Sequence, residues 1–134
     1  MRDVALAAAL SLAAALSLAA GCGSEFDLDR PVDLPRLTYP AGRPFALDLE
    51  MARCRRDCET IGAATCEVDV QTDDRAIVVT AEVQVDRQEG VACGDCAGAA
   101  VFARCEVEES LAEGPWTVRS SEGGFSRTIT LVGE

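Results

Sequence analysis

Four cysteines in this chain have spacings that occur in metal and redox sites. Cys54 and Cys58 form a C-x3-C pair, and Cys93 and Cys96 form a C-x2-C pair. Four thiolates at these spacings can hold zinc tetrahedrally, and C-x2-C is also the spacing of dithiol redox motifs. In an oxidising compartment the same cysteines form structural disulfides instead. The chemistry of these pairs therefore depends on where the protein is located.

The amino-terminal segment predicts export. Its first 20 residues are almost all Ala, Leu, Val and Ser, and Arg2 is the only basic side chain among them. The apolar run from Val4 to Leu18 is shorter than the roughly 20 residues that a transmembrane helix needs, and it is typical of a secretory signal peptide. The alternative, a buried helix of the mature fold, is disfavoured because no polar face recurs at helical spacing.

The sequence LAAGC at residues 18–22 resembles the lipobox of bacterial lipoproteins, in which small residues precede the cysteine that begins the mature chain. Ala19 departs from the pattern, since Leu is commonest at its position. The resemblance implies cleavage by the lipoprotein signal peptidase between Gly21 and Cys22, and lipidation of the Cys22 thiol. It also implies a lipid-anchored protein of the bacterial cell envelope. By the sorting rule of enteric bacteria, Gly23 after the cysteine implies the outer membrane.

The cysteine count agrees with lipidation at Cys22. Seven cysteines are an awkward number for an exported protein, but an acylated Cys22 leaves six that can form three disulfides, each worth about 2–4 kcal/mol. These candidates are Cys54, Cys58, Cys66, Cys93, Cys96 and Cys105. The loops that hold the two closely spaced pairs are expected at the same end of the domain, so we expect bridges between these loops. Six cysteines allow 15 pairings, and this reasoning does not place Cys105, which lies inside a predicted strand.

Charge and composition exclude several function classes. The net charge is −11, all twelve cations are Arg, and there is no His. Nucleic acid is disfavoured as a partner because it requires clustered cations. Without His, Ser-His-Asp and Cys-His catalysis are excluded, and the usual general base near neutral pH is missing. The acids Asp27, Asp29 and Asp33 lack the glycine and the bidentate Glu of a calcium loop. We therefore predict a protein that is not an enzyme and has no catalytic residue, metal or cofactor.

The organisation of the chain follows from these segments. Residues 1–21 are predicted to be the lipoprotein signal peptide. Residues 22–44 contain the lipidated cysteine, four prolines and several acids, and are predicted to form a flexible tether with one short strand at 36–39. Residues 45–134 are predicted to form the folded domain, which the tether would hold away from the membrane.

Beyond Pro44 apolar and polar residues alternate with a period of two, which is typical of half-buried strands. Strands are predicted at 45–51, 66–71, 76–86, 100–108, 111–118 and 125–132. Residues 72–75 supply a turn that joins two of them in a hairpin. The sequence LAEGPWTV at 111–118 resembles the corner and penultimate strand of Ig-like domains, with Trp116 as a core residue. We predict an all-β fold, a small antiparallel β-sandwich of Ig-like, Greek-key type stabilised by disulfides, with a small open barrel as the alternative.

Two classes of function remain open for this domain. The first is a non-catalytic envelope module that binds a protein or peptide partner through a sheet edge or through the cysteine-rich loops. The second is an envelope redox or metal-handling protein that uses the C-x3-C and C-x2-C thiols. A hydrolase would need two carboxylates in a cleft, and no acid stands out beside an aromatic platform for a sugar. A count of free thiols distinguishes the first two classes, because structural disulfides leave none.

Overall fold

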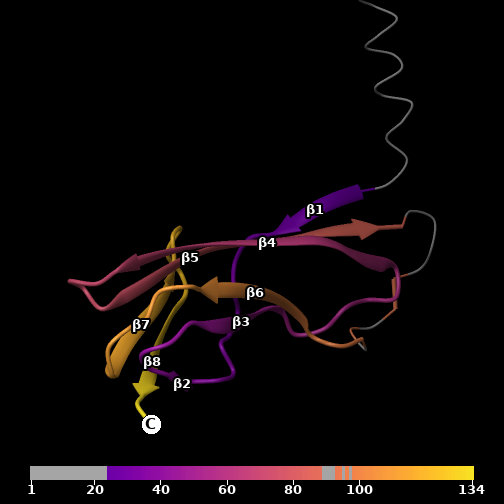
Figure 1. Ribbon diagram of the computed structural model, residues 1–134. Helices are drawn as coiled ribbons and strands as arrows, with labels where there is room; N and C mark the ends of the chain where they lie inside the picture. Colours follow the sequence, from indigo (N-terminus) through magenta and orange to yellow (C-terminus); the bar gives the residue numbers. More distant parts are fainter. Residues whose placement is uncertain (1–23, 89–92, 95, 97) are drawn as a thin grey trace, which may run out of the picture.

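The computed structural model describes residues 24–88, 93, 94, 96 and 98–134, and every regular element in these residues is a β-strand (Figure 1). The prediction of an all-β fold is therefore confirmed. The strands are β1 (Ser24–Leu28), β2 (Thr38–Pro40), β3 (Phe45–Ala52), β4 (Glu59–Gln71), β5 (Ala76–Arg87), β6 (Val101–Val107), β7 (Gly114–Ser120) and β8 (Ser126–Val132).

The period-two alternation identified the core face of each long strand. Every second residue of β3 and β6 is buried, and their neighbours point outward, apart from Glu50, which is buried beside Met51. Alternating residues of β5 and β8 are buried in the same way. The predicted inward residues that the structure buries are Phe45, Leu47, Leu49, Met51, Ile77, Val79, Ala81, Val83, Val85, Val101, Ala103, Cys105, Val107, Phe125, Ile129 and Leu131.

The predicted hairpin is present as β4 and β5, which pair antiparallel over almost their whole length. At the turn, the backbone N–H of Arg75 donates to the carbonyl oxygen of Thr72 at 3.2 Å. Arg75 has a φ of 50°, a left-handed conformation that is uncommon for a residue with a side chain. Its guanidinium donates to the carbonyl oxygens of Glu113 at 3.1 Å and Pro115 at 3.3 Å. These contacts hold the turn against the start of β7.

The larger sheet is mixed, which corrects the prediction of a purely antiparallel fold. It contains six strands, with β5, β7, β8 and β2 adjacent in that order, and β4 and β1 both pair with β5. The β5–β7 and β2–β8 pairs are parallel. Parallel neighbours require a long crossover, and β6 provides it, because the chain leaves β5, crosses through the other sheet and returns to β7. Alternation of side chains carries no information about strand direction, so the sequence did not indicate this arrangement.

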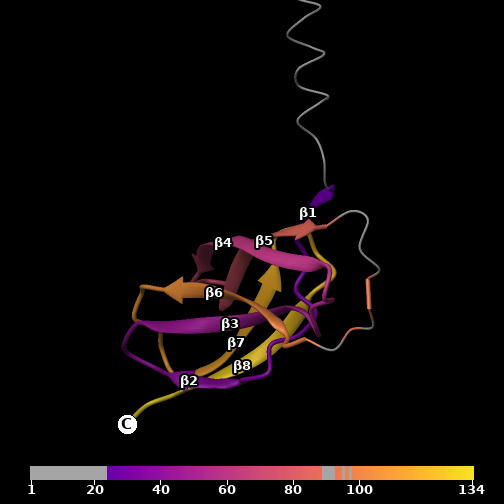
Figure 2. The same ribbon diagram turned by 90° about the vertical axis from the view of Figure 1, so that its right-hand side faces the viewer.

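The smaller sheet consists of β3 and β6, paired antiparallel. In Figure 2 these two strands lie in front of β7 and β8 and cross them. Side chains from both sheets form one continuous core, and this core includes Leu47 of β3, Val118 of β7 and Ile129 of β8, each with no exposed surface. The predicted core residue Trp116 is 2% exposed, and its indole N–H donates to the carbonyl oxygen of Ala112 at 3.0 Å.

The segment predicted as a tether differs from that expectation over residues 24–44. β1 pairs with the last part of β5, and β2 pairs with β8 at the far edge of the larger sheet. Leu34, between these two strands, is 1% exposed, Tyr39 of β2 is 2% exposed, and both belong to the core. Burial of two large apolar side chains favours a packed segment over a mobile one. The residues after Gly23 are therefore part of the folded domain.

Candidate functional site

Two disulfides join the cysteine-rich loops at one end of the molecule. Cys54 is bonded to Cys96, and Cys58 is bonded to Cys93, with Cα–Cα distances of 5.5 and 5.0 Å. This confirms the expectation that bridges run between the two loops. The loops also contact each other through their backbones, because the N–H of Gly98 donates to the carbonyl oxygen of Arg55 at 2.9 Å. A Cβ at residue 98 would lie 2.7 Å from that oxygen, so the approach requires glycine.

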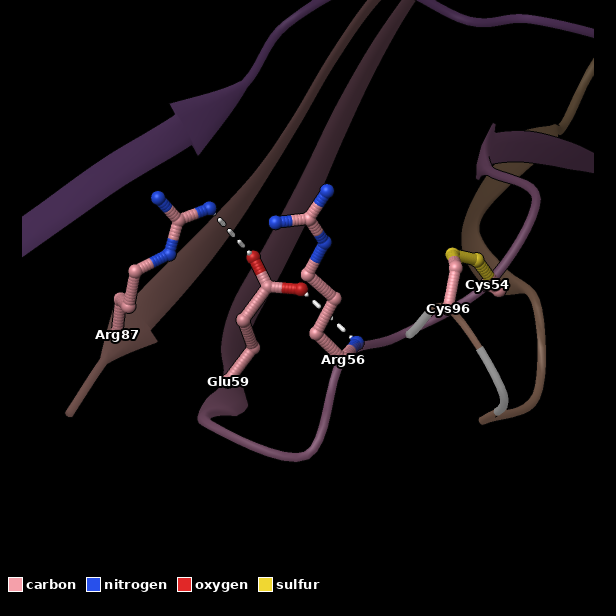
Figure 3. The surroundings of a disulfide bond; sticks show 5 residues. All are labelled: Cys54, Arg56, Glu59, Arg87 and Cys96. Atoms are coloured by element: carbon pink, nitrogen blue, oxygen red, sulfur yellow. Dashed lines mark hydrogen bonds and ion pairs between the residues drawn. A yellow bond between two sulfur atoms is a disulfide. The ribbon is translucent and has the colours of Figure 1, made fainter. Parts of the chain in front are cut away.

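Glu59 braces the loop that carries Cys54 and Cys58 (Figure 3). One carboxylate oxygen accepts the backbone N–H of Arg56 at 3.0 Å, and the other accepts the guanidinium of Arg87 at 3.1 Å. Burial raises the pKa of Glu59, but these hydrogen bonds and the positive charges of Arg87 and Arg56 outweigh it and lower the pKa. The ionised carboxylate thus ties the loop to the end of β5.

The third disulfide connects the two sheets. Cys66 of β4 is bonded to Cys105 of β6 with a Cα–Cα distance of 5.2 Å. Cys105 has no exposed surface, whereas Cys66 is half-buried near the edge of the larger sheet. The sequence alone did not indicate a partner for Cys105, and the structure shows that the partner is Cys66. This bridge therefore fixes how β6 lies against β4.

With all six of these cysteines paired, the state described here offers no thiolate to a metal and no dithiol to a redox reaction. Among the residues that the structure describes, no three His, Cys, Asp or Glu side chains lie together in a group that could hold a metal ion. Two of the three acids near the amino terminus, Asp27 and Asp33, also have separate surroundings. Asp27 pairs with Gln84 along β1 and β5, while Asp33 forms an ion pair with Arg127 at 3.4 Å.

A groove lies between β4 and β6, and the sequence did not predict it. It begins at the Cys66–Cys105 bridge, and its volume is about 350 Å³. β4 and β6 run in the same direction away from this bridge (Figure 1). They belong to different sheets and are not paired with each other: β4 pairs with β5, and β6 pairs with β3. Besides the bridge, the groove is lined by Val68 and Val70 of β4, Arg104 and Glu106 of β6, and Glu108 and Glu109 after β6.

The outer face of the smaller sheet carries charged and apolar groups next to this groove. Arg104 donates from Nε to a carboxylate oxygen of Glu106 at 2.8 Å, and this contact raises the pKa of Arg104. Arg104 also lies opposite Asp48 in the ladder. Phe102 is 46% exposed beside a second cavity of about 390 Å³, which Pro35 also lines. The Arg104–Glu106 pair has no net charge, although Arg104 keeps its own positive charge and both side chains are exposed.

The remaining site residues from the sequence, Gly21 and Cys22, lie outside the described residues, so cleavage and lipidation stay predictions. The groove was missed because it depends on which strand edges lack a neighbour. Its one sequence signal is the alternation of Cys66, Val68 and Val70, which the structure leaves only half-buried although they were predicted to face inward.

Across the ranges of the chain that the structure describes, no helix has the length and apolarity to cross a membrane. Comparison with known proteins found no matching family model, no matching curated protein and no matching solved structure.

Proposed function

We propose that this chain is a bacterial envelope lipoprotein whose β-domain binds a protein or peptide partner without catalysis. In this proposal the chain is cleaved after Gly21 and anchored by acyl groups on Cys22, at the outer membrane. The observation that carries it is the pairing of the cysteines. All six that follow Cys22 are joined to one another, which leaves Cys22 as the seventh, at the position where the lipobox resemblance expects a lipid.

The architecture supports a binding module. We infer that the two sheets form a small sandwich, because their side chains share one core, and its Ig-like type stays a prediction. Three disulfides hold a domain of this size rigid in an oxidising compartment. The chain contains no His, and five carboxylates of the described residues make ion pairs, those of Asp33, Glu50, Glu59, Glu106 and Glu134. Among the strands that the structure describes, β4 and β6 each have an edge without a neighbour, and such an edge is a surface that a partner can use.

The test is the intact mass of the native protein extracted from membranes, measured with and without reduction and alkylation. The proposal predicts a chain that begins at Cys22, carries acyl chains and gains six alkyl groups only after reduction. Cys22→Ser is the control, since it removes the acylated thiol and should abolish the lipid mass without changing the alkylation count. A native mass without lipid would contradict the anchor. Alkylation before reduction would favour the redox or metal-handling alternative.

A further inference from the structure

We propose that the groove between β4 and β6 binds an extended, basic segment of a partner protein, which adds as a strand to the free edge of β4. This inference rests on the proposed binding function and names its site and ligand. The groove is defined by Val68, Val70, Arg104, Glu106, Glu108 and Glu109, together with Cys66 of the Cys66–Cys105 bridge.

The backbone edge of β4 that faces away from β5 supports this site first. β4 has 13 residues and pairs with β5 along one side, while among the described residues no strand pairs with its other side. An unpaired edge presents backbone N–H and C=O groups that an extended chain can pair with. β6 approaches this edge at the Cys66–Cys105 bridge, where the two Cα atoms are 5.2 Å apart. Beyond the bridge the two strands enclose a cavity of about 350 Å³ instead of pairing.

The second argument is the spacing of the apolar groups in the groove. Val68 and Val70 pack against the core but are only half-buried. They are two residues apart on one strand, so their side chains lie on the same face, roughly 7 Å apart. A bound segment in the extended conformation presents alternate side chains at the same interval. Its small apolar side chains would therefore cover both valines and remove their exposed surface from water.

The third argument is charge. Glu106, Glu108 and Glu109 line one wall, and the single cation there, Arg104, is already engaged by Glu106 at 2.8 Å. On β4, the exposed acids Glu67 and Asp69 alternate with the groove residues, so they point to the opposite face of the strand and do not line the groove. Three acids beside a single cation on this wall favour arginine or lysine in the segment, and they disfavour an acidic one. A second copy of this chain, at a net charge of −11, is a poor occupant for the same reason.

The experiment measures binding of a labelled short peptide of alternating Arg and Val to the full-length native protein in detergent. A peptide of alternating Glu and Val should not bind. A third peptide, identical to the first but methylated at alternate backbone nitrogens, keeps the charges and loses donors for strand pairing, so it should bind at least about tenfold more weakly.

The groove itself is tested with the double variant Glu108→Arg/Glu109→Arg. It should weaken binding of the Arg-Val peptide by about tenfold, because two attractive charges become repulsive. The matched control is Asp86→Arg/Glu122→Arg, which makes the same change in net charge at exposed positions that do not line the groove. The control should leave the affinity unchanged.

Equal weakening by the two double variants would mean that the peptide responds only to net charge, and it would overturn the site. Equal binding of the methylated peptide would overturn strand addition. The intact mass of the same preparation separates this failure from failure of the proposed function. A lipidated, fully disulfide-bonded protein that ignores the peptide refutes the groove alone, whereas free thiols or a missing lipid refute the anchored module.

Discussion

Glu59 makes the stability of the folded protein depend on pH. Its carboxylate accepts hydrogen bonds from the Arg56 backbone and the Arg87 guanidinium, and its pKa is lowered from the ordinary value of 4.5. A carboxyl group whose pKa is lower in the folded state stabilises that state when ionised. This contribution is fully present above about pH 4.5, and it is lost as the pH falls through the folded pKa.

Glu59→Gln should therefore destabilise the protein at pH 7 by on the order of 1 kcal/mol, an amount that allows for solvent screening around the 43% exposed Arg87 side chain. The difference from the unmodified protein should shrink as the pH is lowered below 4.5. Guanidinium unfolding at neutral and acidic pH measures both quantities. Glu82→Gln, at an exposed position of β5, is the control and should show little effect. A difference that stays constant with pH would contradict the role of the ionised carboxylate.

Leu34 and Leu37 lie three residues apart in the segment that the sequence predicted as a tether. Leu34 is 1% exposed within the core, and Leu37 is 47% exposed. Leu34→Ala should lower the free energy of unfolding by about 2–5 kcal/mol, because it removes buried methyl groups and leaves a cavity. Leu37→Ala should change it by less than about 0.5 kcal/mol. Chemical denaturation of the two variants provides the comparison. Equally small effects of both substitutions would favour the original prediction of a flexible tether.

At the scale of strands and sheets, the Cys66–Cys105 bridge is the covalent link between the two layers of the fold. The double variant Cys66→Ala/Cys105→Ala should destabilise the protein by about 3–4 kcal/mol. Without the bridge the denatured chain gains conformational entropy, and this is the amount expected for a loop of this length. Loss of the fully buried Cys105 sulfur adds a packing term.

The comparison variant is Cys54→Ala/Cys96→Ala, whose sequence separation of 42 is close to the 39 of the first pair. Removal of this bridge should change the entropy of the denatured chain by nearly the same amount. Because Cys96 is exposed and Cys54 is half-buried, less packing is lost, so the total loss of stability should be smaller. Differential scanning calorimetry of the two double variants ranks them. If the loop variant were the less stable of the two, the bridge between the sheets would not be the main constraint.

The long strands could be predicted because a half-buried strand has apolar residues on its buried face and polar residues on its exposed face, and these alternate along the sequence. Phe45 to Met51 and Val101 to Val107 show this clearly, and the structure buries the expected side. β1 was missed because it has only five residues, among them the half-buried Phe26 and Leu28, and a proline-rich segment follows it. The first half of β4 was missed because Gly62, Ala63 and Ala64 have low strand propensity. There the ladder with β5 contains an irregularity.

The candidate sites divide in the same way. Pairing between the two cysteine-rich loops was predictable, because the order of the predicted strands places both loops at the same end of the domain. The partner of Cys105 and the groove were not, because they depend on how the two sheets are placed on each other. No local pattern in the sequence records which edge of β4 lacks a neighbour. A docking surface that consists of a strand edge without a neighbouring strand can be recognised only from the three-dimensional structure.

At the scale of the whole molecule, the position of β1 determines how the domain would be attached. Ser24 pairs with Arg87 at the end of β5, close to the loops that carry two disulfides. Only Gly23 separates Ser24 from Cys22, and two residues span at most about 7 Å. A domain anchored at Cys22 would therefore sit on the bilayer with its disulfide-bonded end nearest the lipid, rather than at the end of a long tether.

This placement has a mechanical consequence. β1 runs antiparallel to β5 over five residue pairs, with its amino-terminal end beside the carboxyl-terminal end of β5. A partner that pulls on β4 beyond the Cys66–Cys105 bridge would draw the hairpin away from the anchor, nearly along the strand axes. Force between the lipid and the partner would then shear β1 along β5 and load all of their hydrogen bonds together. A ladder loaded in this direction resists tension better than one opened a single bond at a time, so β1, although only five residues long, is well placed to carry such a force.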